Sequence, residues 1–135
     1  MLDNDLLQKA IKILDDGGLV GIPTETVYGL AADAENQEAV QSIYKAKNRP
    51  SNHPLIVHLA NAKAIPRWVS DFNEDAKKLT DTFWPGPLTI ILKKSDVAKD
   101  FVTGGQDTVA LRCPSHPIAH RLLEIFDRGQ GKGLA

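Results

Sequence analysis

The sequence contains little cysteine, no long apolar run and almost no net charge. Its single cysteine, Cys113, excludes an internal disulfide and fits a reducing compartment. No segment approaches the roughly 18 consecutive apolar residues of a membrane-spanning helix, and the start of the chain lacks the basic residues of a secretory signal. Because 16 basic residues face 17 acidic ones, the net charge of -1 gives no overall attraction to nucleic acid or membrane. We therefore expect a cytoplasmic protein.

The charges are unevenly distributed along a chain that is long enough for one domain. With 135 residues, 42% of them hydrophobic, the chain can bury one substantial core. Residues 1–38 carry eight acids and two bases, whereas residues 39–70 carry five bases and no acid. The second segment therefore creates a local positive field.

The spacing of apolar residues predicts alternating helices and strands. We expect helices at 4–16, 37–47, 62–68, 73–83 and 114–126, and strands at 19–23, 55–59, 88–92 and 108–112. Asn36 is suited to cap the second helix, and Pro66 interrupts the third. Interleaved elements indicate an α/β fold, and connections too short for a crossover helix favour a mixed sheet. The tail "DRGQGKGLA" has no apolar pattern and is predicted to be loose.

The basic segment "KAKNRPSNHPLIVH" has two interpretations. Cations such as Lys47 stabilise the end of a helix, so a purely structural role is available. Alternatively, Lys47 and Arg49 converge on a phosphate, with arginine giving a bidentate contact and lysine a point charge. The residues alone leave both open.

The histidines and Cys113 give no recognisable metal or hydrolytic motif. His58 interrupts an apolar strand and needs a polar partner, which makes it either a satisfied core residue or a ligand contact. His116 and His120 are four apart but lack the adjacent glutamate of a zinc hydrolase. Cys113 is predicted to be a buried thiol, and "GQGKG" lacks the spacing of a phosphate-binding loop.

The stretch "PTETVYGL" (23–30) follows an apolar strand and is rich in hydroxyl groups. It is either a tight turn that uses the freedom of Gly29 or a polar loop at a strand end, where open α/β sheets bind ligands. Thr24 and Thr26 could then contact a small polar molecule.

Four motifs in register resemble one known family. The motifs "GLVGIPTETVYGLAADA", "IYKAKNRPSNHPLIVHL", "FWPGPLTIIL" and "TVALRCPSHP" are similar, in order and spacing, to the YrdC-like threonylcarbamoyl-AMP synthases. The resemblance runs from about Gly18 to about Leu123. It implies a twisted open mixed sheet with flanking helices around a concave, positively charged cavity.

The resemblance also implies an activity. Such enzymes join L-threonine, bicarbonate and ATP into L-threonylcarbamoyl-AMP and release pyrophosphate. Partner proteins then use the product to modify the adenosine beside the anticodon of certain tRNAs. Mg²⁺ is expected to arrive with the nucleotide, and no protein nucleophile or protein-ligated metal is implied.

Site residues follow from matching positions in the family. The resemblance assigns L-threonine to Thr26, His58 and Arg112, and the wall of that pocket to Thr24 and Tyr28. It assigns ATP to Lys47, Arg49, His53 and Thr108, although the family often has asparagine where this chain has His53.

Members of the family continue beyond this point, with a Ser-Ala-Asn motif expected soon after "GKGLA". We therefore expect residues 1–135 to form a single domain that is incomplete at its C-terminal end, either as a fragment or as a shortened member with an incomplete pocket. Two other functions stay open. One is a non-catalytic module that binds nucleotide, double-stranded RNA or tRNA, and the other is a carbamoyl-handling domain like that of hydrogenase maturation proteins.

Overall fold

The computed structural model describes residues 4–23, 28–50 and 52–135. Its helices are α1 Asn4–Asp15, α2 Gln37–Lys47, the 3₁₀ turn η1 Ala62–Ala64, α3 Ile65–Trp68, α4 Glu74–Phe83, α5 Asp100–Thr103 and α6 Pro117–Asp127. Its strands are β1 Val20–Pro23, β2 Tyr28–Ala31, β3 Ile56–Leu59, β4 Thr89–Lys93, β5 Thr108–Arg112 and β6 Gly133–Leu134. None of the helices in these ranges is long and apolar enough to cross a membrane.

The strands form an open mixed sheet, as the sequence predicts. One sheet has the order β4-β5-β3-β6, in which β3 and β5 are parallel and the other two pairs are antiparallel. Strands β1 and β2 form an antiparallel hairpin. A bridge between Asp33 and Leu134, with backbone hydrogen bonds between Ala32 and Ala135, links the hairpin to β6.

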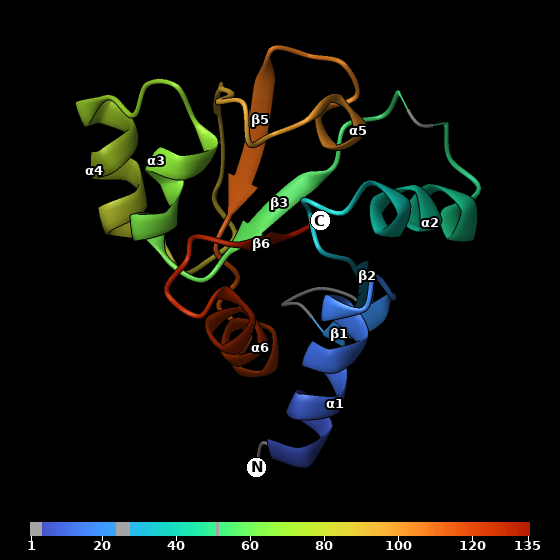
Figure 1. Cartoon of the computed structure of the whole chain (residues 1–135). Coiled ribbons are helices and arrows are strands. Elements are labelled where there is room, and N and C mark those ends of the chain that lie inside the picture. The colour runs from blue at the N-terminus through green and yellow to red at the C-terminus, as the bar shows by residue number, and fades with distance from the viewer. Residues whose placement is uncertain (1–3, 24–27, 51) are drawn as a thin grey trace.

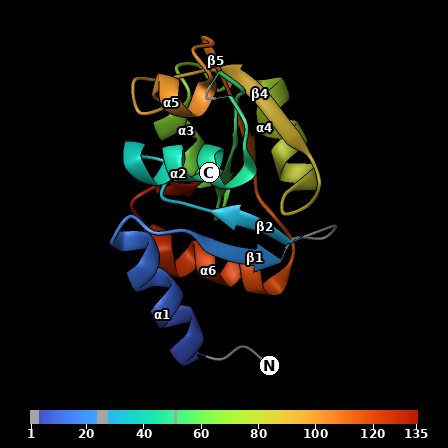
Figure 2. The same ribbon diagram turned by 90° about the vertical axis from the view of Figure 1, so that its right-hand side faces the viewer.

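Two apolar cores hold the helices to the strands. The first lies on the face of the sheet that buries Val57, Leu59, Val109 and Leu111, and α2, α3 and α5 pack on it. The second joins α1, α6 and the hairpin, and it includes Leu134. In the view of Figure 1, α2 and α5 lie to the right of β3 and β5, α3 and α4 lie to the left, and α1 and α6 lie below. Figure 2 shows the hairpin between α6 and the upper part of the molecule.

Helix α2 begins and ends where its sequence indicates. The side chain of Asn36 accepts a hydrogen bond from the backbone N–H of Ala39 at 3.1 Å, which caps the amino end. At the other end Asn48 adopts the left-handed conformation (φ 51°, ψ 48°), and this turns the chain out of the helix. The turn positions the segment that carries Arg49.

The prediction of a loose C-terminal tail was wrong. Gly133 and Leu134 form β6, the end strand of the four-stranded sheet beside β3, and Leu134 is fully buried and bridged to Asp33 on its other side. The approach to β6 is fixed by polar contacts: the Trp68 indole N–H donates to the carbonyl of Gly131 at 2.7 Å, and the Asp127 carboxylate accepts the N–H of Lys132 at 2.8 Å. The sequence does not predict β6 because a strand of two residues is too short to show an alternating apolar pattern.

Two further elements were not predicted. The second half of "PTETVYGL" is strand β2, so the connection between the hairpin strands is shorter than the stretch suggested. The short helix α5 lies between the predicted strands at 88–92 and 108–112 and contributes Val102 to the first core. A helix of four residues is too short for its apolar spacing to be distinctive.

Candidate functional site

The candidate site lies on the sheet face opposite the first core. Side chains alternate between the two faces of a strand, so the burial of Val109 and Leu111 in that core places Thr108, Ala110 and Arg112 on the other face. The same alternation in β3 places His58 on that face.

His58 and Arg112 are direct neighbours in the sheet. They are partners in the parallel pairing of β3 with β5, and both lie at the carboxyl ends of their strands. Both residues are half-buried. The guanidinium of Arg112 donates through Nε to the carbonyl of Gly86 at 3.2 Å, which restrains the arginine at this end of the sheet. The structure thus brings together two of the three residues that the resemblance assigned to threonine.

The next row across the sheet is apolar. Ala110 is the register partner of both Ile56 in β3 and Ile91 in β4. The two isoleucines are 39% and 65% exposed. At β6 the same face is covered, because Leu134, the register partner of His58, packs into the second core. Among the described residues the face is therefore closed at β6 and open over β4 and β5.

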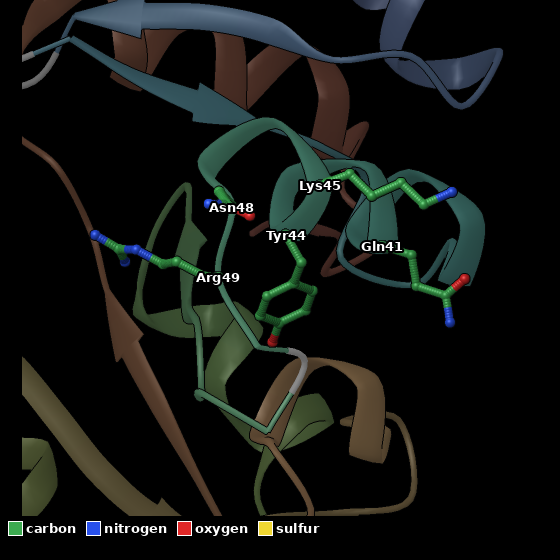
Figure 3. A pocket seen from close by; sticks show the side chains of 5 residues that line it. All are labelled: Gln41, Tyr44, Lys45, Asn48 and Arg49. Atoms are coloured by element: carbon green, nitrogen blue, oxygen red, sulfur yellow. The ribbon is translucent and has the colours of Figure 1, made fainter.

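The cation segment follows α2. We define the Arg49 loop as residues 48–50 and 52–54. Arg49 lines an open hollow of about 390 Å³ together with the neighbouring side chains Gln41, Tyr44, Lys45 and Asn48. Figure 3 shows the side chain of Arg49 pointing away from those of Gln41 and Lys45. Lys47 is the exposed last residue of α2.

The last residues of the Arg49 loop, 52–54, lie at the opposite end of the strands from Arg112. They lead directly into β3, which runs parallel to β5, and Ile56 is the partner of Ala110. Residues 52–54 therefore lie at the same end as Thr108, the first residue of β5, whereas Arg49 follows the end of α2. The exposed side chain of His53 belongs to this loop. Of the positions assigned to ATP, His53 and Thr108 thus lie at the amino ends of β3 and β5. Of those assigned to threonine, His58 and Arg112 lie toward the carboxyl ends.

The structure does not describe the side chains of three predicted residues, Thr24, Thr26 and Tyr28. Thr24 and Thr26 lie outside the described residues. The backbone of Tyr28 begins β2, opposite Pro23, but its side chain is likewise outside the description.

The other candidates, Cys113, His116 and His120, lie outside this face, and their side chains contact main-chain groups. The Sγ of Cys113 lies 3.3 Å from the carbonyl oxygen of Ala60, and the residue is buried, as predicted. His120 Nε2 lies 2.8 Å from the same carbonyl, and His116 Nδ1 accepts the N–H of Ile118. Within the described ranges, no group of three or more His, Cys, Asp or Glu side chains is arranged to hold a metal ion.

The hydroxyl of Tyr44 forms hydrogen bonds that the sequence patterns did not predict. Its ring is buried, yet its hydroxyl lies 2.6 Å from the carbonyl oxygen of His53 and 3.2 Å from that of Phe101. Burial raises the pKa of the phenol above its usual value, so the hydroxyl keeps its proton as a donor. The sequence does contain one indication of this role. A tyrosine at a core position of a helix has a buried hydroxyl, and a buried hydroxyl normally forms a hydrogen bond.

Comparisons with known proteins agree with this arrangement. A sequence model of the family Sua5_yciO_yrdC, described as Telomere recombination, matches residues 12–129. The chain belongs to this family. A threonylcarbamoyl-AMP synthase of Pyrococcus abyssi is 46% identical over 119 residues, which are 88% of this chain and 35% of the relative. One of Bacillus subtilis is 47% identical over 118 residues, or 87% of this chain and 34% of the relative.

Solved structures of the Sua5/YciO/YrdC family have the same fold. The crystal structure of P. abyssi Sua5 complexed with L-threonine superposes with a TM-score of 0.93 at 41% identity, and the match covers 100% of this chain and 38% of that one. The predicted fold class is confirmed. This chain spans about a third of the length of the curated relatives described above.

Proposed function

We propose that this chain provides the threonine site and part of the nucleotide site of a threonylcarbamoyl-AMP synthase. The observation that carries the proposal is the arrangement on one sheet face: His58 and Arg112 are adjacent at one end, and Thr108 lies on the same face at the other. Arg112 is four positions along the strand from Thr108, which corresponds to roughly 13 Å. An extended aminoacyl-adenylate-like molecule can span such a distance.

In this proposal the carboxyl ends of β3 and β5 hold L-threonine. Arg112 pairs with the amino acid's carboxylate, for which a guanidinium offers a bidentate partner. His58 lies beside it and contacts the polar end of the same molecule. Thr26 completes the contacts, and Thr24 and Tyr28 form the wall. The relative from P. abyssi supports this, because it was solved with L-threonine.

The amino ends of β3 and β5 hold ATP, supplied as its magnesium complex. Lys47 and Arg49 neutralise phosphate charge, and His53 and Thr108 provide polar contacts beside them. We propose that these groups line the positively charged, concave cavity that the family resemblance implies. The predominance of bases over acids in residues 39–70 favours an anionic ligand here.

The reaction requires positioning and no protein nucleophile. The threonine amine and bicarbonate form a carbamate with loss of water. A carbamate oxygen then attacks the α-phosphorus of ATP, the bond to the β-phosphate oxygen breaks, and pyrophosphate leaves. Holding the anionic reactants close and stabilising the phosphate charge are tasks for the arginine and lysine side chains. We further propose that the product is passed to proteins that modify tRNA and that the reaction takes place in the cytoplasm.

The test is incubation with ATP, bicarbonate and labelled L-threonine. In a full-length form that completes the nucleotide site, we expect pyrophosphate release that depends on threonine, and its loss in Arg49→Ala and Arg112→Gln. Lys77→Ala removes an exposed cation from α4 and serves as the matched control, with release unchanged. If the protein binds tRNA but neither ATP nor threonine, the synthase proposal is refuted in favour of an RNA-binding module.

A further inference from the structure

The phenol of Tyr44 connects two segments that are far apart in sequence. The residue is only 4% exposed, and its ring belongs to the first core. Its hydroxyl, which carries one proton, is close to the carbonyl oxygen of His53 in the Arg49 loop at 2.6 Å and to that of Phe101 in α5 at 3.2 Å. The shorter contact makes His53 the main acceptor. One side chain of α2 thus reaches both the loop that precedes β3 and the helix that precedes β5.

The same two segments meet at further backbone contacts. The N–H of Leu55 donates to the carbonyl of Val102 at 2.9 Å. Gly104 has φ +67°, and a Cβ added there would lie 2.5 Å from the carbonyl oxygen of Asn52. Only a glycine permits this conformation and this approach together. The main chain of the loop is therefore held against the α5–β5 connection.

The side chains of the Arg49 loop remain accessible although its backbone is fixed. Arg49 and His53 are both exposed, and the N–H of Arg49 donates to the carbonyl of Tyr44 at 2.9 Å. The anchors are thus backbone groups and one buried phenol, and they leave the guanidinium and the imidazole facing outward. Four residues beyond Gly104, the chain reaches Thr108.

We propose that Tyr44 is a positioning residue of the nucleotide site: its hydroxyl fixes the Arg49 loop to α5 and thereby sets Arg49 and His53 relative to Thr108. This inference rests on the proposed function, since it takes ATP as the ligand of these three residues. Removing the hydroxyl frees the His53 carbonyl to bond with water, because the loop is exposed. The loop then samples other positions, and a bound nucleotide must order it again.

The test is the variant Tyr44→Phe, which keeps the buried ring and removes only the hydroxyl. The affinities for ATP and for L-threonine are measured separately by calorimetry on the wild-type chain and on the variant. We expect ATP to bind about 3- to 10-fold more weakly, the factor that corresponds to one lost hydrogen bond. Threonine affinity stays unchanged, because His58 and Arg112 lie at the other end of the strands.

Thr80→Val is the matched control. It removes a buried hydroxyl that donates to the carbonyl of Lys77 at 3.0 Å, in α4 and away from the Arg49 loop. This variant should bind both ligands as the wild type does. If Tyr44 has only a structural role, Tyr44→Phe should lower the affinity for both ligands or for neither. Either result overturns the proposal. Failure of the wild-type chain to bind ATP would instead refute the proposed function, and Tyr44's role with it.

Hydrogen exchange gives a second readout. In Tyr44→Phe the amide of Leu55, which bonds to Val102, should exchange faster, whereas the amide of Ala135, which bonds to Ala32, should not change. ATP should slow the exchange of Leu55 again. Unchanged exchange of Leu55 in the variant would show that the hydroxyl does not hold the loop, and the proposal would be wrong.

Discussion

Replacing Leu134 by alanine should destabilise the protein strongly. Leu134 is fully buried in the second core, between α1, α6 and the hairpin. The residues around it have little freedom to collapse into the space, because Ala135 on its C-terminal side is hydrogen-bonded to Ala32 in both directions, at 2.8 and 3.3 Å. Truncations of leucine to alanine in such cores cost about 2–5 kcal/mol, and we expect about 3 kcal/mol here.

The measurement is urea unfolding followed by circular dichroism. For a domain of this size the slope is about 2 kcal/mol per molar urea, so the loss should lower the midpoint by about 1.5 M. Leu79→Ala provides the comparison, since Leu79 is 44% exposed on α4 and its truncation should cost less than about 1 kcal/mol. Equal shifts for the two variants, or a shift below about 0.3 M for Leu134→Ala, would refute the packing of β6 against β3 and the second core.

Three other outcomes follow from single contacts. Gly133→Ala should lower stability by about 1–3 kcal/mol, because the new Cβ would lie 2.6 Å from Val57 Cγ1, and an unchanged melting temperature would contradict this. Asn36→Ala should cost about 1 kcal/mol through loss of the cap on α2, whereas Asn36→Asp should restore most of it in the same unfolding assay. Burial raises the pKa of Tyr44 above 10.0, so its contribution to stability is complete below that pH and is lost as pH rises above it. Stability should therefore fall less steeply above pH 10 in Tyr44→Phe than in the wild type, and identical slopes would contradict the shift.

The predictable part of the fold is the part with local signals. Helix α2 was predicted within its observed bounds because Asn36 caps it and its apolar residues recur at helical spacing. Strand β5 was predicted at its observed bounds because the large apolar residues of "TVALR", Val109 and Leu111, recur at every second position. Strand β6 had no such signal, since its stability comes from β3 and from residues 32–34, which lie about a hundred positions earlier.

In the candidate site, too, the identity of single residues was predictable, whereas their arrangement in space was not. The family resemblance identified His58 and Arg112 as candidates, but their adjacency depends on the parallel register of β3 with β5, which no single strand specifies. The anchoring of the Arg49 loop also depends on distant partners, because the acceptors of the Tyr44 hydroxyl come from His53 and from Phe101. Patterns within one segment identify side chains of the right chemistry, whereas their grouping depends on tertiary contacts.

We propose that one sheet face binds threonine at one end and ATP at the other, and an NMR titration of the nitrogen-15-labelled chain with each ligand alone tests this. We expect L-threonine to shift the amide signals of His58 and Arg112, and ATP to shift those of Arg49, His53 and Thr108. Shifts confined to α1 and α6 with either ligand, or no shifts with both, would contradict it.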